Sequence, residues 1–151
     1  MKHWIKFLSA VIAAAAFTSI AGTYAFAQAA AAHGTTVKVA RSRLGRILVD
    51  SRGVTLYDFV ADKHGRSSCY GACEAYWPPL LTKGKPHAGT GVRASLLGTT
   101  KRKDGRLEVT YNHHPLYYFV GDRKPRQTTG QGLNQFGAPR WALSPAGKEI
   151  H

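Results

Sequence analysis

The sequence predicts an all-β domain made of two tandem copies of one repeat. Residues 45–62 and 105–122 align without a gap, and eight of the eighteen positions are identical: Gly45/Gly105, Arg46/Arg106, Val49/Val109, Leu56/Leu116, Tyr57/Tyr117, Phe59/Phe119, Val60/Val120 and Asp62/Asp122. Short runs of β-branched and aromatic residues alternate with turn-forming residues, which is typical of strands and hairpins. We therefore expect two β-meander repeats related by a pseudo-twofold, forming a small sandwich or partly open barrel. A propeller is excluded because two blades cannot close a ring.

Each repeat is predicted to contain a three-stranded meander. In the first, the strands cover residues 35–39, 47–49 and 55–60, with turns at 41–45 and 51–53. In the second, they cover 97–101, 107–111 and 116–120, with turns at 103–105 and 112–115.

A crossover and a fourth, tryptophan-bearing strand are expected to complete each repeat. Trp77 and Trp141 both precede Pro and Leu residues and a Gly-Lys turn, and a short helix is expected at 68–76. One copy is too small to bury its apolar face alone. The two copies are therefore expected to pack a shared set of aromatic residues together: Tyr57, Phe59, Trp77, Tyr117, Phe119 and Trp141.

The N-terminus has the pattern of a secretory signal peptide. Basic residues precede an apolar run, and Ala25-Phe26-Ala27 gives a small-x-small cleavage signal. We expect a signal peptide at 1–27, a flexible linker at 28–34 and a single duplicated domain at 35–151, with repeats at about 35–94 and 95–151. The exported protein, periplasmic or extracellular, should have no integral membrane span after cleavage.

Cys69 and Cys73 are the two cysteines, and both lie in the exported part. A disulfide between them is the default in an oxidising compartment. The C-x-x-x-C spacing followed by Glu74 does not fit haem attachment, and no second Cys/His pair has the spacing of a zinc site.

Several motifs together resemble the bacterial secreted repeat family, whose members are described as predicted lipoproteins with a repeated Y-x-(F/W/Y)-x-x-D motif. The motif recurs from Tyr57 to Asp62 and from Tyr117 to Asp122, accompanied by the blocks 68–80 and 111–119. The resemblance implies export and β-rich repeats, and it carries over no catalytic residue. The chain departs from the family in having no cysteine for lipid attachment near the cleavage site.

Asp62 and Asp122 follow equivalent strands. Paired carboxylates suit acid–base chemistry or a divalent cation, but an Asp after a strand ordinarily binds backbone N–H groups of the next loop in an Asx-type turn. We interpret the repeated Tyr, Phe and Asp residues as structural. Tyr118 is expected on the opposite face from Tyr117, in an exposed aromatic surface together with Tyr70, Tyr76 and Tyr111.

The histidines are a weaker signal for metal binding. The candidate ligands are His64, His87, His113 and His114, none of which recurs in the partner repeat. His33 would complete an amino-terminal copper site only if cleavage followed Ala30. We expect no metal and no cofactor, and metal handling stays an alternative.

Basic residues are duplicated at the turns. Removing Lys2 and Lys6 with the leader lowers the formal charge from +13 to +11, which favours anionic partners. The candidate anion-binding residues are Arg41, Arg43, Arg46, Lys101, Arg102, Lys103, Arg106, Arg123, Lys124 and Arg126.

Together these features indicate an exported, non-catalytic binding or envelope-associated module whose partner is an anionic polymer or an envelope surface. No Gly-x-Ser-x-Gly or phosphate-binding loop is present, so no enzyme activity is expected. The alternative is a periplasmic redox or metal-handling protein that uses Cys69 and Cys73 or the histidines. The sequence leaves the oligomeric state open.

Overall fold

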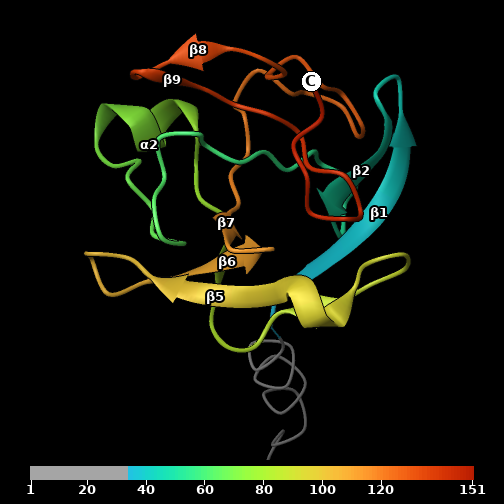
Figure 1. Ribbon diagram of the computed structural model, residues 1–151, viewed down its shortest axis with the longest axis horizontal. Helices are drawn as coiled ribbons and strands as arrows, with labels where there is room; N and C mark the ends of the chain where they lie inside the picture. Colours follow the sequence, from blue (N-terminus) through green and yellow to red (C-terminus); the bar gives the residue numbers. More distant parts are fainter. Residues whose placement is uncertain (1–33) are drawn as a thin grey trace, which may run out of the picture.

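The computed structural model describes residues 34–151, which form a strand-rich domain with one short α-helix (Figure 1). The expected signal peptide and residues 28–33 of the linker lie outside the described residues. Within 34–151, no helix is long and apolar enough to cross a membrane. The all-β prediction is confirmed, and the strands form three separate sheets rather than a closed barrel.

Two antiparallel hairpins, one from each repeat, form the largest parts of the structure. The first joins β1 (Thr36–Ser42) to β2 (Gly45–Asp50), and the second joins β5 (Leu97–Lys101) to β6 (Leu107–Tyr111). Both fall where alternating apolar residues flank a turn glycine, Gly45 or Gly105, with φ near +90°. The remaining short strands are β3 (Leu81–Thr82), β4 (His87–Ala88), β7 (His114–Pro115), β8 (Asn134–Gln135) and β9 (Ala138–Pro139).

The short strands extend or accompany the hairpins. β4 pairs with β1 in parallel, while β3 and β7 pair antiparallel with β6. β8 and β9 form a separate hairpin beside α2 (Ala72–Tyr76) (Figure 1), where Tyr76 and Phe136 bring their ring centroids to 5.9 Å.

The pseudo-twofold passes between Tyr57 and Tyr117. The Tyr57 N–H donates to the Tyr117 carbonyl at 2.9 Å, and the Tyr117 N–H donates to the Tyr57 carbonyl at 2.8 Å. The same residue of each repeat therefore pairs with its own counterpart, as a twofold relation requires.

The two repeats exchange their last segments. Leu48 of the first hairpin donates its N–H to Leu143 of the second repeat at 3.0 Å, and Val109 of the second hairpin donates to Leu80 of the first at 2.8 Å. Each tryptophan-bearing segment thus lies against the hairpin of the other repeat and does not complete its own meander. The two repeats are thus joined by hydrogen bonds in both directions.

The structure corrects the expected bounds of the two third strands and of the helix. The expected third strands at 55–60 and 116–120 are extended segments held by isolated bridges at Thr55, Tyr57 and Tyr117. Turns at 60–61 and 120–121 end these segments. Tyr57 and Tyr117 pair with each other, so neither segment forms a continuous ladder with the second strand of its own repeat. The helix begins at Ala72 rather than Ser68, because Gly71 takes a positive φ of 58° directly before it.

The expected match of Trp77 with Trp141 is also wrong. Tyr118 donates its N–H to the Pro78 carbonyl, whereas its counterpart Asp58 donates to the Trp141 carbonyl. Pro78 is therefore the partner of Trp141 under the pseudo-twofold, and Trp77 is the partner of Arg140. Trp77 and Arg140 are both fully buried, whereas the ring of the half-buried Trp141 packs on His151.

Candidate functional site

Each repeat's motif tyrosine binds the motif aspartate of the other repeat. The hydroxyls of Tyr57 and Tyr117 donate to Asp122 Oδ2 and Asp62 Oδ2, both at 2.7 Å. The second oxygen of each aspartate accepts a backbone and a hydroxyl bond from Ser68 or Thr129, six or seven residues onward in its own loop. This anchor is longer than an Asx-type turn. Burial raises the pKa of Asp62 and of both tyrosines.

The pseudo-twofold places Trp77 and Arg140 in equivalent aromatic cages. The Trp77 ring stacks on Phe119 at 4.5 Å and meets the edge of Tyr57 at 5.6 Å. The Arg140 guanidinium lies 3.8 Å from the Phe59 centroid and 4.5 Å from that of Tyr117.

The space beside the two cages explains why the first repeat carries a disulfide and the second a glycine at the equivalent place. A Cβ on Gly130 would lie 2.9 Å from the Trp77 ring, so only glycine fits there. The equivalent loop position of the first repeat holds Cys69, next to the narrower guanidinium of Arg140. The smaller guanidinium therefore leaves room for the Cys69 side chain and its disulfide, whereas Trp77 leaves room only for glycine.

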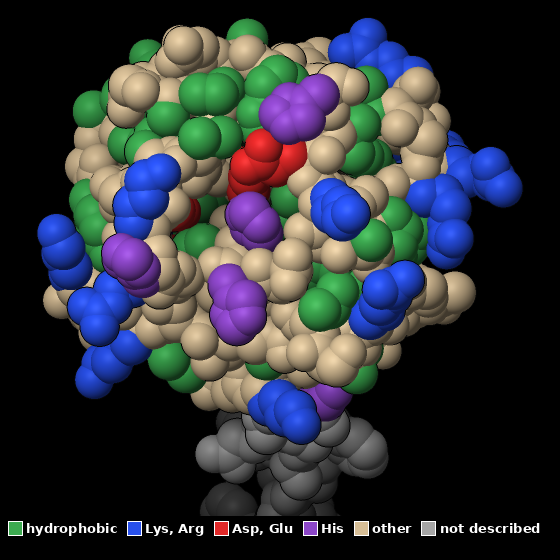
Figure 2. Space-filling view, in the orientation of Figure 1, with side chains coloured by type: hydrophobic (Ala, Val, Ile, Leu, Met, Phe, Trp, Pro, Cys, Tyr) green, Lys and Arg blue, Asp and Glu red, His purple; other side chains and the backbone are tan. Residues whose placement is uncertain are grey.

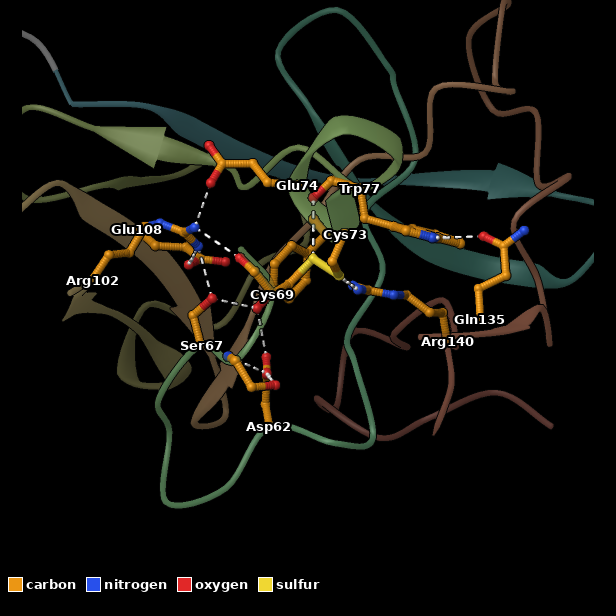
Figure 3. The surroundings of a disulfide bond; sticks show 12 residues. Asp62, Ser67, Cys69, Cys73, Glu74, Trp77, Arg102, Glu108, Gln135 and Arg140 are labelled. Carbon is orange, nitrogen blue, oxygen red and sulfur yellow. Dashed lines mark hydrogen bonds and ion pairs between the residues drawn. A yellow bond between two sulfur atoms is a disulfide. The ribbon is translucent and has the colours of Figure 1, made fainter. Parts of the chain in front are cut away.

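The predicted disulfide between Cys69 and Cys73 is confirmed. Arg140 Nη2 lies 3.2 Å from Cys69 Sγ and 3.1 Å from Cys73 Sγ (Figure 3). The Nε and Nη1 atoms of this buried guanidinium have no hydrogen-bond partner among the described residues. Burial without a paired carboxylate lowers the pKa of Arg140 to about 10.

A second buried arginine supports the same loop. Arg102 donates to Glu108 at 2.6 Å, Ser67 at 2.7 Å, Glu74 at 2.8 Å and the Cys69 carbonyl at 2.9 Å (Figure 3). Arg102 is only 3% exposed, so the expectation of a solvent-facing turn residue is wrong for it. Burial raises the pKa of Glu108 to about 7, although the Arg102 bond opposes this shift.

Two expected anion-binding residues lie beside this cluster at a shallow pocket. Its volume is about 430 Å³, and it is lined by Arg66, Ser67, Tyr70, Thr100, Lys101, Arg102 and Lys103. The side chains of Arg66, Lys101 and Lys103 are exposed and form no ion pair within the described part of the chain. The ammonium of Lys103 lies 5.5 Å from the Tyr70 ring centroid.

The other candidate cations do not gather at one place. Arg106 is neutralised by Asp104 and Glu74, and Arg43 donates to Thr128. The remaining ones are exposed: Arg41, Arg46, Arg123, Lys124 and Arg126. Figure 2 shows Lys and Arg side chains at many places on one face, with only a small group of acidic ones.

The histidines and tyrosines differ from their expected surroundings. His64 and His113 are exposed at left-handed turn positions, with φ of 55° and 67°. His114 instead lies 3.2 Å from the carboxylate of Asp58, a residue that sequence reasoning missed. The exposed tyrosine surface is wrong for Tyr111, which is fully buried, while Tyr118 is half-buried and donates to Asp50 at 3.1 Å.

Comparison with known proteins identifies the family. A family model described as a secreted repeat of unknown function matches residues 38–81 and 98–144, so the chain belongs to this family and carries two copies of its repeat. The description of the family as secreted supports export. Neither curated proteins nor solved structures gave a match to the chain.

Proposed function

We propose that the protein is an exported, non-catalytic module that binds anionic polymers, with its main contact at the pocket of Arg66, Lys101 and Lys103. The observation that carries this proposal is the convergence of three exposed, unpaired cations on one concave surface. The hydroxyl of Tyr70 holds the Lys103 N–H at 3.0 Å and so fixes the loop that presents Lys103.

The use of the carboxylates supports the same function. The eight Asp and Glu residues of the chain all lie in the described part, and each has a tyrosine, hydroxyl, histidine or arginine partner. Among the Lys and Arg residues at 34–151, only Arg52, Arg102 and Arg106 form ion pairs. Most of the positive charge therefore remains available to an external anion.

The test is the salt dependence of binding to a single-stranded oligonucleotide. The double variant Lys101→Ala/Lys103→Ala should reduce the logarithmic salt slope by up to about 1.4, because each single-strand phosphate contact contributes about 0.7. The matched control is Arg41→Ala/Arg46→Ala, which changes exposed cations of the first hairpin outside the pocket.

The control should lower the affinity less than the pocket variant does. Absence of binding at low salt, or equal effects of the two double variants, would contradict the pocket as the binding site. Arg102→Ala is not a suitable probe because Arg102 is part of the buried network.

A second candidate function is redox exchange at the disulfide, favoured by the contact of Arg140 with both sulfurs. A dithiol reductant would transfer two electrons and two protons to the Cys69–Cys73 bond and itself become a disulfide. Loss of one thiol proton would then give a thiolate beside the unpaired guanidinium. A cation at this distance stabilises a thiolate and hence the reduced state.

The reduction potential tests this candidate. In redox buffers, Arg140→Met should shift the potential to a more negative value, by about 30 mV for each tenfold loss of the equilibrium constant. Arg140→Lys, which keeps a cation, should shift it less. Equal potentials for all three proteins would contradict a redox role for Arg140.

A further inference from the structure

Three side chains from distant parts of the sequence meet near the C-terminal end of the domain. Asp58 follows the central Tyr57, His114 lies on β7, and Glu149 pairs with Leu143 in an isolated bridge. One donor atom from each lies within 4.8 Å of the other two. Figure 2 shows acidic and histidine side chains grouped on the face drawn, near the position of the C-terminus in Figure 1.

Asp58 is the part of this group that points to a ligand. Its side chain is only 1% exposed. Oδ1 accepts the Trp141 N–H at 3.0 Å, but Oδ2 has no hydrogen bond and faces His114 Nδ1 at 3.2 Å. The buried Oδ2 carries a desolvation cost, which a protonated His114 or a bound cation can offset.

The duplication shows that the fold does not require an acid here. Tyr118 occupies the position of Asp58 in the second repeat, and its hydroxyl donates to Asp50. His114 likewise corresponds to Val54, an apolar residue. Asp58 and His114 therefore stand at positions where the two repeats differ. The Tyr–Asp hydrogen bonds that hold the fold together occur in both repeats and do not involve them.

From this geometry we propose a binding site for a divalent transition metal ion, with Asp58, His114 and Glu149 as ligands and His151 as the fourth. His151 Nε2 lies 3.1 Å from Glu149 Oε2, and its ring is positioned by contact with Trp141 at 4.5 Å.

The ligand set selects the kind of ion. Imidazole nitrogen combined with carboxylate oxygen suits Zn²⁺ or its first-row neighbours, whereas Ca²⁺ and Mg²⁺ prefer oxygen alone. Zn–N and Zn–O bonds of about 2.0–2.2 Å place donor atoms about 3–4 Å apart, so small side-chain rotations bring these residues to bonding distance.

The experiment measures Zn²⁺ binding by the exported protein without a histidine tag. Equilibrium dialysis with metal analysis should give one Zn²⁺ per chain, and Co²⁺ in its place should give visible absorption of a low-symmetry four-coordinate site. His114→Ala and Glu149→Gln should each weaken binding by at least about tenfold, since even outer-shell changes cost 10–100-fold. His113→Ala is the matched control, because the adjacent His113 is exposed and outside the group.

A His151→Ala variant tests the fourth ligand and keeps the Ile150 carbonyl, which accepts from Gln131, within the chain. Its affinity for Zn²⁺ should also fall, and an unchanged affinity would overturn the assignment of His151. The proposal as a whole fails if the wild-type protein binds no stoichiometric Zn²⁺. It also fails if folded His114→Ala and Glu149→Gln proteins, with unchanged circular dichroism spectra, bind Zn²⁺ as the wild type does.

Discussion

Tyr57 and Tyr117 each hold a carboxylate of the opposite repeat, so the family motif connects the two copies as well as shaping each one. The Tyr hydroxyl binds one oxygen of the aspartate, and the following loop binds the other. Strand, loop and partner repeat are thus joined through one carboxylate. This arrangement explains why Tyr and Asp recur together at a fixed spacing.

The first prediction concerns this pair. Tyr57→Phe should lower the free energy of unfolding by about 1–3 kcal/mol, because Asp122 Oδ2 loses its donor in a partly buried place. Urea denaturation measures the change. In a double-mutant cycle with Asp122→Asn, a coupling energy of at least about 0.5 kcal/mol is expected. Additive effects would show that the bond contributes nothing beyond each side chain. Lys124→Ala, at an exposed position, should stay within about 0.5 kcal/mol.

The second prediction compares Arg102 with Arg43, which binds the equivalent loop from the first hairpin. Arg102→Ala should destabilise the protein by about 3–5 kcal/mol, because it leaves Glu108 buried without its cation. Arg43 is exposed and faces no buried carboxylate, so Arg43→Ala should cost about 1 kcal/mol or less. Equal losses for the two variants would contradict the distinct role of Arg102.

The Arg102→Ala loss should also depend on pH. Burial raises the pKa of Glu108 to about 7, above its value in an unfolded chain. Its contribution to stability is therefore present at low pH and is lost as the pH rises through about 7. Protonated Glu108 needs no cation, so the gap between wild type and Arg102→Ala should be smaller at pH 5 than at pH 8. Urea denaturation at both values checks this; a gap that widens at pH 5 would contradict it.

At the level of elements, the disulfide and α2 depend on each other. α2 has five residues, too few for a stable isolated helix, and the disulfide ties its first turn to the preceding loop. Cys69→Ala/Cys73→Ala should lower the free energy of unfolding by about 2 kcal/mol, the low end for disulfides, because the closed loop is very short. Denaturation with and without reductant measures it, and complete unfolding on reduction would contradict this local role.

The two long hairpins and the disulfide could be predicted from the sequence, since alternation, turn glycines and cysteine spacing are local signals. The third strands could be predicted only in part. They begin by pairing within their own repeat, as Thr55 does with Val49, but Tyr57 and Tyr117 then pair with each other across the repeats. The sequence suggests matching Trp77 with Trp141, because both are tryptophans. The structure matches Trp77 with Arg140 instead, since these two residues take the equivalent buried positions, which the sequence does not reveal. For Asp58 the sequence holds one weak sign of a special role: the matching position of the second repeat is Tyr118.

At the scale of the whole molecule, charge is divided between interior and surface. The carboxylates bind partners within the chain. The surface carries an excess of cations, as the proposed anion binding requires. Both repeats contribute to this surface. In the pocket, for example, Arg66 and Tyr70 come from the first repeat and Lys101 and Lys103 from the second. We therefore expect the domain to unfold as one unit.

Separation of the repeats tests the exchange most directly. The fragments 34–94 and 95–151 each keep one hairpin but lose the segment that covers it, since Leu143 lies on Leu48 and Leu80 on Val109. Each fragment alone should give a poorly dispersed amide NMR spectrum and no cooperative unfolding, whereas an equimolar mixture should restore the dispersed spectrum of the intact chain. A folded, cooperatively unfolding 34–94 fragment would contradict the exchange and show that one repeat suffices for the fold.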